Sequence, residues 1–189
     1  EGELVTQNDP KGRPTVYKNL PKIKQAKWIA IGRLDFNTSG LLIFTSSGEL
    51  ANRLMHPKFE VVREYSVRIL GALNDDQLHL LKTGIELDDG PAKFDSIQYE
   101  GGEGANKWYK VTLKEGRNRE VRRIFEYLDL TVSRLIRIRF GEIKLPTYLK
   151  RGMHEELAQK QVIKILEENQ IDASAFKIPQ IKNTRKNKN

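Results

Sequence analysis

Residues 32–48 read Gly-Arg-Leu-Asp-Phe-Asn-Thr-Ser-Gly-Leu-Leu-Ile-Phe-Thr-Ser-Ser-Gly. Two apolar runs, residues 28–31 and residues 41–44, flank a polar loop in this stretch. Both runs have the length and the bounding turn residues that are typical of buried strands. The stretch therefore predicts a strand, a loop and a second strand, with one acid, Asp35, on the loop.

Asp35 has two interpretations. A carboxylate on a loop between buried strands can be rigid and partly desolvated, and such a group can act as a nucleophile or a general base. In the alternative, Asp35 bonds its own backbone in a tight Asx-turn, which is a common use of Asp between strands. The residues of the loop leave both interpretations open.

The composition indicates a globular chain without disulfides. Its 189 residues, 38% of them hydrophobic, suffice for one sizeable domain or two small ones. Cys is absent and the three His residues are scattered, so we expect no metal site. No apolar run reaches the length of a membrane span, and the first residues do not form a signal peptide. We therefore expect a cytoplasmic protein that does not contact a membrane.

The positive charge is concentrated in one internal segment. The whole chain has a net charge of +8, and residues 107–151 alone hold 13 Lys and Arg against 5 Asp and Glu, also a net +8. The segments before and after it carry −2 and +2. A folded basic segment of this kind predicts a surface for a polyanion.

Short strands outnumber helices, which predicts an α+β fold with a largely antiparallel sheet. Strands are expected at residues 65–70, 94–99 and 108–113. A further strand is expected over residues 134–140, where alternation would place Leu135, Arg137 and Arg139 on one face and Ile136, Ile138 and Phe140 on the other.

Cap residues precede three expected helices: Ser46 (with Glu49 in a capping box), Asn74 and Asn118. Pro57 would end the first helix, and Gly84 would supply a left-handed end to the second. The third carries an apolar stripe at helical spacing, and residues 155–169 form a fourth helix. We expect one domain over residues 1–171 and a flexible basic tail over residues 172–189.

The central stretch resembles the signature of the RsuA-type ribosomal RNA pseudouridine synthases. The resemblance rests on Gly32-Arg33-Leu34-Asp35, then Thr38, Gly40-Leu41-Leu42, Thr45 and Gly48, and with later motifs it covers residues 1–155. It implies a mixed, mainly antiparallel sheet with flanking helices and a central cleft. In the family a small RNA-binding domain of the S4 type comes first. That domain is not in this sequence, so we expect the catalytic domain alone.

The resemblance also implies roles for single residues. Asp35 would be the catalytic nucleophile, Tyr65 an active-site tyrosine that stacks on the base, and Arg122 the cation that pairs with Asp35. Leu135 would wall the uracil pocket, and the basic turn before residue 120 would meet phosphates. The expected substrate-binding residues are Arg33, Asn37, Thr38, Arg117, Asn118, Arg119, Leu135 and Arg137.

Structural alternatives stand beside these roles. Tyr65 and Leu135 could be core residues, and residues 117–123 could be a solvated basic helix face. The predicted alternation places two arginines beside Leu135, which favours a face toward the cleft because buried arginines need partners.

The implied function is isomerisation of one uridine to pseudouridine in ribosomal RNA, with 23S rRNA as the expected substrate. The uridine would be extruded from its helix. This reaction needs no cofactor, and the sequence holds no Gly-rich phosphate loop for a nucleotide cofactor. We expect a monomer. One alternative is a noncatalytic RNA-binding protein of the ribosome or of its assembly. A weaker one is a glycosidase-like enzyme, which would need a second acid near Asp35.

Overall fold

Residues 1–175 are described by a computed structural model, in which the chain divides into two compact units. The sheet unit contains Glu1 and residues 34–41 and 56–147. The hairpin unit contains residues 2–33, residues 42–55 and the described chain from Tyr148 onward. Most of the tail expected at residues 172–189 lies outside the described residues.

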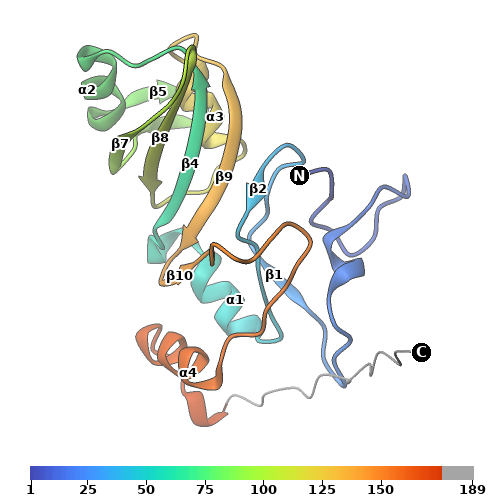
Figure 1. Cartoon of the computed structure of the whole chain (residues 1–189). Helices are drawn as coiled ribbons and strands as arrows, with labels where there is room; N and C mark the ends of the chain where they lie inside the picture. The colour runs from blue at the N-terminus through green and yellow to red at the C-terminus, as the bar shows by residue number, and fades with distance from the viewer. Residues whose placement is uncertain (176–189) are drawn as a thin grey trace. The chain divides into compact units, whose positions relative to one another are not determined.

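The sheet unit is built on a six-stranded, mainly antiparallel sheet (Figure 1). Five strands follow the order β10-β9-β4-β8-β7, each antiparallel to its neighbours, and β2 pairs with β9 in parallel. The strands are β2 (Ser39–Gly40), β4 (Arg63–Leu70), β7 (Ser96–Gly101), β8 (Asn106–Leu113), β9 (Val132–Phe140) and β10 (Ile143–Lys144). This arrangement confirms the predicted α+β class.

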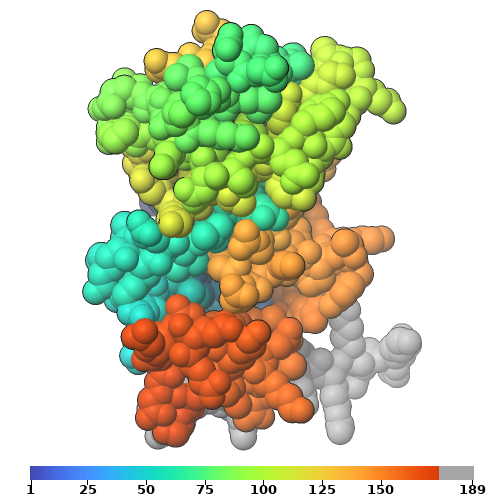
Figure 2. Space-filling model, turned by 90° about the vertical axis from the view of Figure 1, so that its left-hand side faces the viewer, coloured from blue at the N-terminus to red at the C-terminus, as the bar shows by residue number. Residues whose placement is uncertain are grey.

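The hydrophobic core of this unit lies on one face of the sheet, the inner face. Alternate residues of β4 are buried there, among them Tyr65, Val67 and Ile69. The core also takes residues from the helices and from a two-stranded hairpin, which are α2 (Asp75–Thr83), α3 (Glu120–Glu126), β5 (Ile85–Leu87) and β6 (Gly90–Ala92). Burying each large apolar side chain stabilises the unit by about 1.5–3 kcal/mol. The outward side of α2 lies on the molecular surface (Figure 2).

Strand β9 departs from the predicted alternation because it contains a β-bulge. Tyr65 pairs with Arg137 and the next residue back, Glu64, pairs with Arg139, so Ile138 is the extra residue. A bulge reverses the order of faces beyond it. Arg139 therefore faces away from Arg137, and the expectation that the two share a face is wrong.

Phe140 lies on the inner face with Arg137, again contrary to the predicted alternation. The Arg137 guanidinium carbon is 5.2 Å from the centre of the Phe140 ring. Arg139 instead bonds Glu64 at 2.9 Å on the other face. The bulge thus separates an inner arginine from an outer one.

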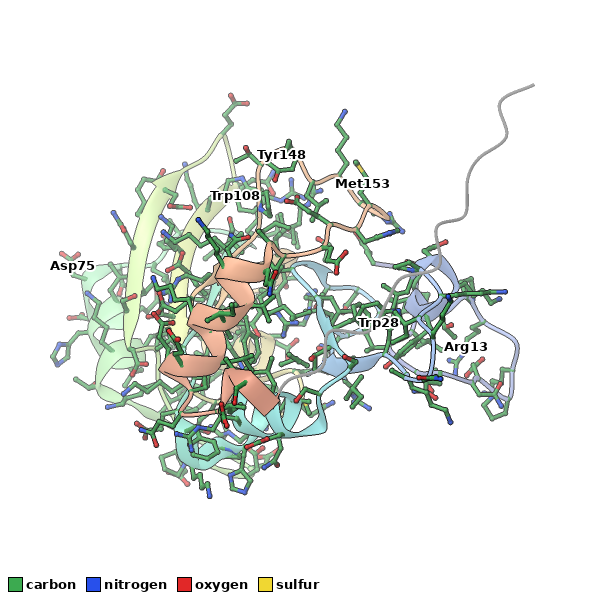
Figure 3. All side chains as sticks on the ribbon, turned by 90° about the horizontal axis from the view of Figure 1, so that it is seen from below. Arg13, Trp28, Asp75, Trp108, Tyr148 and Met153 are labelled. Carbon is green, nitrogen blue, oxygen red and sulfur yellow. The ribbon has the colours of Figure 1, made fainter. Side chains whose placement is uncertain are left out.

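The hairpin unit pairs β1 (Ile29–Ile31) with β3 (Ile43–Thr45) in antiparallel register, as the flanking apolar runs predicted. Its helical segments are η1 (Val16–Asn19), α1 (Gly48–Met55), α4 (Gln159–Glu168) and η3 (Ala173–Ala175). The indole of Trp28 donates to the Pro21 carbonyl at 2.7 Å and ties the segment before β1 together (Figure 3 labels Trp28). Within residues 1–175, no helix combines the length and apolar character that crossing a membrane requires.

The helix caps follow the sequence only in part. Asn74 caps α2 in a capping box with Gln77, as predicted, and Gly84 follows that helix with a φ of +128°. The cap of α1 is Ser47, whose hydroxyl accepts from the Leu50 amide at 3.1 Å, so the capping box expected from Ser46 is wrong. The helix begins one residue later than that box requires.

The expected cap of α3 is also wrong. Arg119 occupies the cap position in a left-handed conformation, with a φ of +50°, and no side chain caps the helix there. The carboxylate of Glu120 instead accepts from the Arg117 amide at 2.9 Å. The first turn is thus closed by an acid from within the helix, and Asn118 is not needed as a cap.

Candidate active site

Asp35 lies at the start of a β-turn. Its backbone carbonyl accepts from the Thr38 amide at 2.9 Å, with Phe36 and Asn37 at the tip. The tight turn that the sequence indicated is therefore present, but the main chain closes it. The Asp35 carboxylate makes no hydrogen bond or ion pair with any of residues 1–175, and its residue is half-buried. The acid is thus held by its backbone and keeps its side chain available for chemistry.

Arg122 fixes the tip of this turn. The side chain comes from α3, is only 5% exposed, and donates to the Asn37 carbonyl at 2.8 Å and to the Val132 carbonyl of β9 at 2.9 Å. One guanidinium thus joins the loop to the sheet. A planar donor fork suits two acceptors in fixed directions better than an ammonium group does.

Arg122 and Asp35 interact electrostatically without forming an ion pair among the described residues. Burial lowers the pKa of Arg122, nearby Arg119 lowers it further, and Asp35 opposes both effects. The direct pairing that the sequence predicted is replaced by bonds to two backbone carbonyls. Arg122 therefore acts on the acid by positioning its loop and by attraction over a longer distance.

The far end of the loop is joined to the middle of β9. The Leu41 amide donates to the Arg137 carbonyl at 2.7 Å, and the Arg137 Nε donates back to the Leu41 carbonyl at 2.8 Å. Gly40 lies between these bonds with a φ of +105°. The loop that carries Asp35 is therefore attached to β9 at two places, at its tip through Arg122 and at its far end by Arg137.

Tyr65, Leu135 and Arg137 gather on the inner face of the sheet. Arg137 is only 2% exposed, and burial lowers its pKa, while its side-chain hydrogen bond with Tyr65 favours the charged form. Tyr65 and Leu135 both belong to the buried core. The structure thus brings these three residues together. Tyr65 and Leu135 are packed in the core, as the alternative interpretation of these two residues expects.

Arg117 lies in a separate cluster of charges. It forms ion pairs with Glu120, Asp89 and Glu115, each at 3.0 Å, and donates to the carbonyls of the β5–β6 turn. Arg123 also bonds Asp89, at 2.8 Å. This cluster fastens α3 to the β5–β6 hairpin, so the charge of Arg117 is already met by carboxylates.

The other expected binding residues are distributed over the surface and the loop. Arg119 pairs with Glu126 at 3.2 Å, and the Asn118 carbonyl accepts from Arg123 at 2.9 Å. Thr38 is buried, and its hydroxyl has no hydrogen-bond partner within residues 1–175. Arg33 is an exposed residue of the hairpin unit.

Two residues of the site were missed in the sequence. Gly40 was quoted only as part of a motif, although a Gly between a polar loop and an apolar run is a signal for an unusual backbone conformation. Glu120 is 4% exposed, and its carboxylate accepts a hydrogen bond from Arg117. No pattern in the sequence predicts the burial of that acid.

The chain is similar to proteins that modify RNA. A family model described as RNA pseudouridylate synthase matches residues 1–127. Ribosomal large subunit pseudouridine synthase B of Yersinia pestis is 55% identical over 187 residues, which are 98% of this chain and 59% of that protein. The protein of the same name from Escherichia coli K12 is 61% identical over 157 residues, covering 83% of this chain and 54% of the relative.

A solved structure described as a pseudouridylate synthase has the same fold. It superposes with a TM-score of 0.73 at 26% sequence identity, over 87% of this chain and 70% of that one. The chain spans a little over half the length of the two relatives named above.

Proposed function

Because the chain belongs to the RNA pseudouridylate synthase family, we propose that it isomerises a uridine of ribosomal RNA to pseudouridine, with Asp35 as the nucleophile and 23S rRNA as the substrate. The observation that carries this proposal is the state of Asp35. Its loop is bound to β9 through Arg122 and Arg137, while its carboxylate bonds no other described residue. The names of the relatives, which refer to the large ribosomal subunit, support the choice of RNA.

The reaction breaks the bond from ribose C1′ to N1 of uracil and forms a bond from C1′ to C5. Asp35 either attacks C1′, as the nucleophile of a retaining glycosidase does, or assists a glycal path. The uracil then turns and presents C5 to C1′, and the proton on C5 leaves to solvent. A rigid loop that keeps the carboxylate in place contributes to the rate by orienting the nucleophile.

Arg122 orients the acid in this scheme and attracts its charge. The negative charge of Asp35 raises the pKa of Arg122, against the lowering that burial causes. An opposite charge nearby favours a carboxylate over a carboxylic acid. The Asn37 carbonyl bond holds the turn, so the charge and the geometry come from the same side chain.

The proposed substrate contacts come from two groups of residues. Tyr65 and Leu135 flank the target base from the inner face. Extruding the uracil from its RNA helix costs a few kcal/mol of unstacking. Arg33, Asn37, Asn118 and Arg119 contact the RNA backbone, and the buried Thr38 acts through the loop that contains it. Arg137 acts on the substrate through the loop that it holds, and Arg117 acts through α3.

The experiment follows tritium release from 23S rRNA fragments that carry uridine tritiated at C5. We expect release with this chain and none with Asp35→Asn, which keeps the size and removes the charge. Asp76→Asn, an exposed residue in the first turn of α2, is the matched control and should behave like the wild-type chain.

RNA binding is measured in parallel by fluorescence anisotropy. Release by the wild-type chain, with binding kept and release lost in Asp35→Asn, supports the proposal. Binding by both proteins without release from either would identify a noncatalytic RNA-binding protein and overturn it.

A further inference from the structure

Three side chains form a row across the outer face of the sheet, the face opposite the core. Arg68 of β4 pairs with Trp108 of β8 on one side and with Arg134 of β9 on the other. Their neighbours Val67, Tyr109 and Leu135 are buried, and alternate residues of a strand face opposite ways. Arg134 is exposed, Arg68 and Trp108 are half-buried, and Trp108 is labelled in Figure 3.

Arg68 is held in this row by its neighbours. Its guanidinium carbon lies 5.6 Å from the centre of the Trp108 ring, which is a cation–π distance. Its Nε donates to the Ser133 hydroxyl at 3.0 Å, and that hydroxyl donates back to the Arg68 carbonyl at 3.1 Å. The position of the indole and the guanidinium is thus fixed by the sheet itself.

The charges of the row are not neutralised by acids. Among residues 1–175, neither Arg68 nor Arg134 forms an ion pair, whereas two other cations on this face do: Arg139 with Glu64 at 2.9 Å, and Lys110 with Glu100 at 2.6 Å. Like charges directly opposite each other on neighbouring strands destabilise a sheet. Two facing arginines beside an aromatic ring therefore indicate a surface that an anion completes.

We propose that this row binds RNA outside the target uridine, with one base stacked on Trp108 and phosphates at Arg68 and Arg134. The inference rests on the proposed function. Aromatic rings that alternate with cations are the usual means of binding single-stranded RNA. Three neighbouring strands span about 10 Å, which is roughly the length of three stacked nucleotides.

The row also lies near the loop of Asp35. Arg134 is two residues along β9 from Val132. Arg122 donates both to the Val132 carbonyl and to the Asn37 carbonyl of the loop. The loop continues into β2, which pairs with β9 at Ile136. RNA bound along the row is therefore directed past the edge of β9 that carries the catalytic loop, and the row adds affinity for nucleotides that flank the target.

Anisotropy of a fluorescein-labelled 23S rRNA fragment tests this inference without requiring turnover. Trp108→Ala should weaken binding by about 5- to 100-fold, because it removes one stacked base. Trp108→Phe should restore part of the loss. Arg134→Gln should also weaken binding, and it should lower the slope of log affinity against log salt by about 0.7–0.9, as expected for one phosphate contact.

Two variants off the row serve as controls. Tyr99→Ala removes an exposed aromatic from the edge strand β7, and Lys82→Gln removes an exposed charge from α2. Both should bind RNA like the wild-type chain, and thermal melting verifies that every variant is folded. If Trp108→Ala and Arg134→Gln bind like these controls, the row is not an RNA surface. This test measures RNA binding alone. A chain that releases no tritium would therefore contradict the proposed function, but the binding of the variants would still show whether the row contacts RNA.

Discussion

The backbone of Gly40 lies directly against the backbone of Arg137. A Cβ atom on Gly40 would be 2.2 Å from the Arg137 carbonyl oxygen and 2.6 Å from its amide nitrogen. The φ of Gly40 is +105°, in the region that favours glycine. Glycine is therefore required here by its backbone conformation and by the lack of space for a side chain against β9.

Gly40→Ala should destabilise the sheet unit and reduce tritium release. The matched control is Gly101→Ala, because Gly101 has a similar φ of +99° but open space around it. Both variants carry the conformational strain, and only the first adds the clash with β9. We expect Gly40→Ala to lower the free energy of unfolding by about 2 kcal/mol more than Gly101→Ala does. If thermal melting shows that the two variants lose the same free energy of unfolding, the close approach of Gly40 to the Arg137 backbone is contradicted.

Arg122→Lys should keep the charge near Asp35 but lose the fixed fork between the Asn37 and Val132 carbonyls. A displaced catalytic group can lower the rate about 100-fold, so we expect a loss of that order in tritium release. Arg123→Lys, on the same helix, changes bonds to Asp89 and to the Asn118 carbonyl but none to the Asp35 loop, and it should stay close to the wild-type rate. An Arg122→Lys variant with the wild-type rate would show that charge alone suffices.

Acid titration should reveal the ion pair between Asp9 and Arg13 in the hairpin unit. Hydrogen bonds from Arg13 lower the pKa of Asp9 from its ordinary 3.8 to about 2. Because the folded pKa is depressed, the stabilisation is complete above pH 3.8 and is lost as the pH falls toward 2. Carboxyl NMR titration of Arg13→Gln should show the Asp9 pKa raised toward its ordinary value, and the backbone amides of residues 11 and 13 keep part of the lowering. An unchanged Asp9 pKa would rule out the Arg13 side chain as a cause.

Ser47→Ala should shorten or loosen α1, because the Ser47 hydroxyl accepts from the Leu50 amide. Loss of such a cap costs about 1 kcal/mol. Ser46→Ala changes the neighbouring serine and should have little effect on stability. Chemical denaturation measures the free energy of unfolding of both variants. Equal losses would show that Ser46 and Ser47 both contribute to the N-cap of α1, and not Ser47 alone.

The fold follows from local patterns where short-range physics decides the outcome. The apolar runs around the loop became β1 and β3, and Asn74 caps α2 as its position predicted. The order of faces in β9 did not follow, because a bulge is set by pairing with β4 and leaves no mark in the alternation. Strand periodicity gives the face of a residue only as far as the first bulge.

The contacts of the predicted site residues do not follow from the sequence. Asp35 and Arg122 lie close enough to interact, yet the bonds of Arg122 go to backbone carbonyls, which no sequence pattern specifies. The family resemblance implies that Arg117 binds RNA, and the structure gives it three carboxylate partners. A side chain's charge can be taken from the sequence, but its partner depends on elements far apart in the chain.

The double attachment of the Asp35 loop has a consequence for how the site opens. The Thr38 and Leu41 amides are both bonded, one inside the turn and one to β9. Freeing the loop breaks the Arg122 bond to the Asn37 carbonyl together with the bonds between Arg137 and Leu41, so local fraying of residues 35–41 is suppressed. Hydrogen exchange at these amides should then be slow and follow that of β9, as one cooperative unit. The loop therefore inherits the protection of the central sheet, which is uncommon for a segment without regular structure.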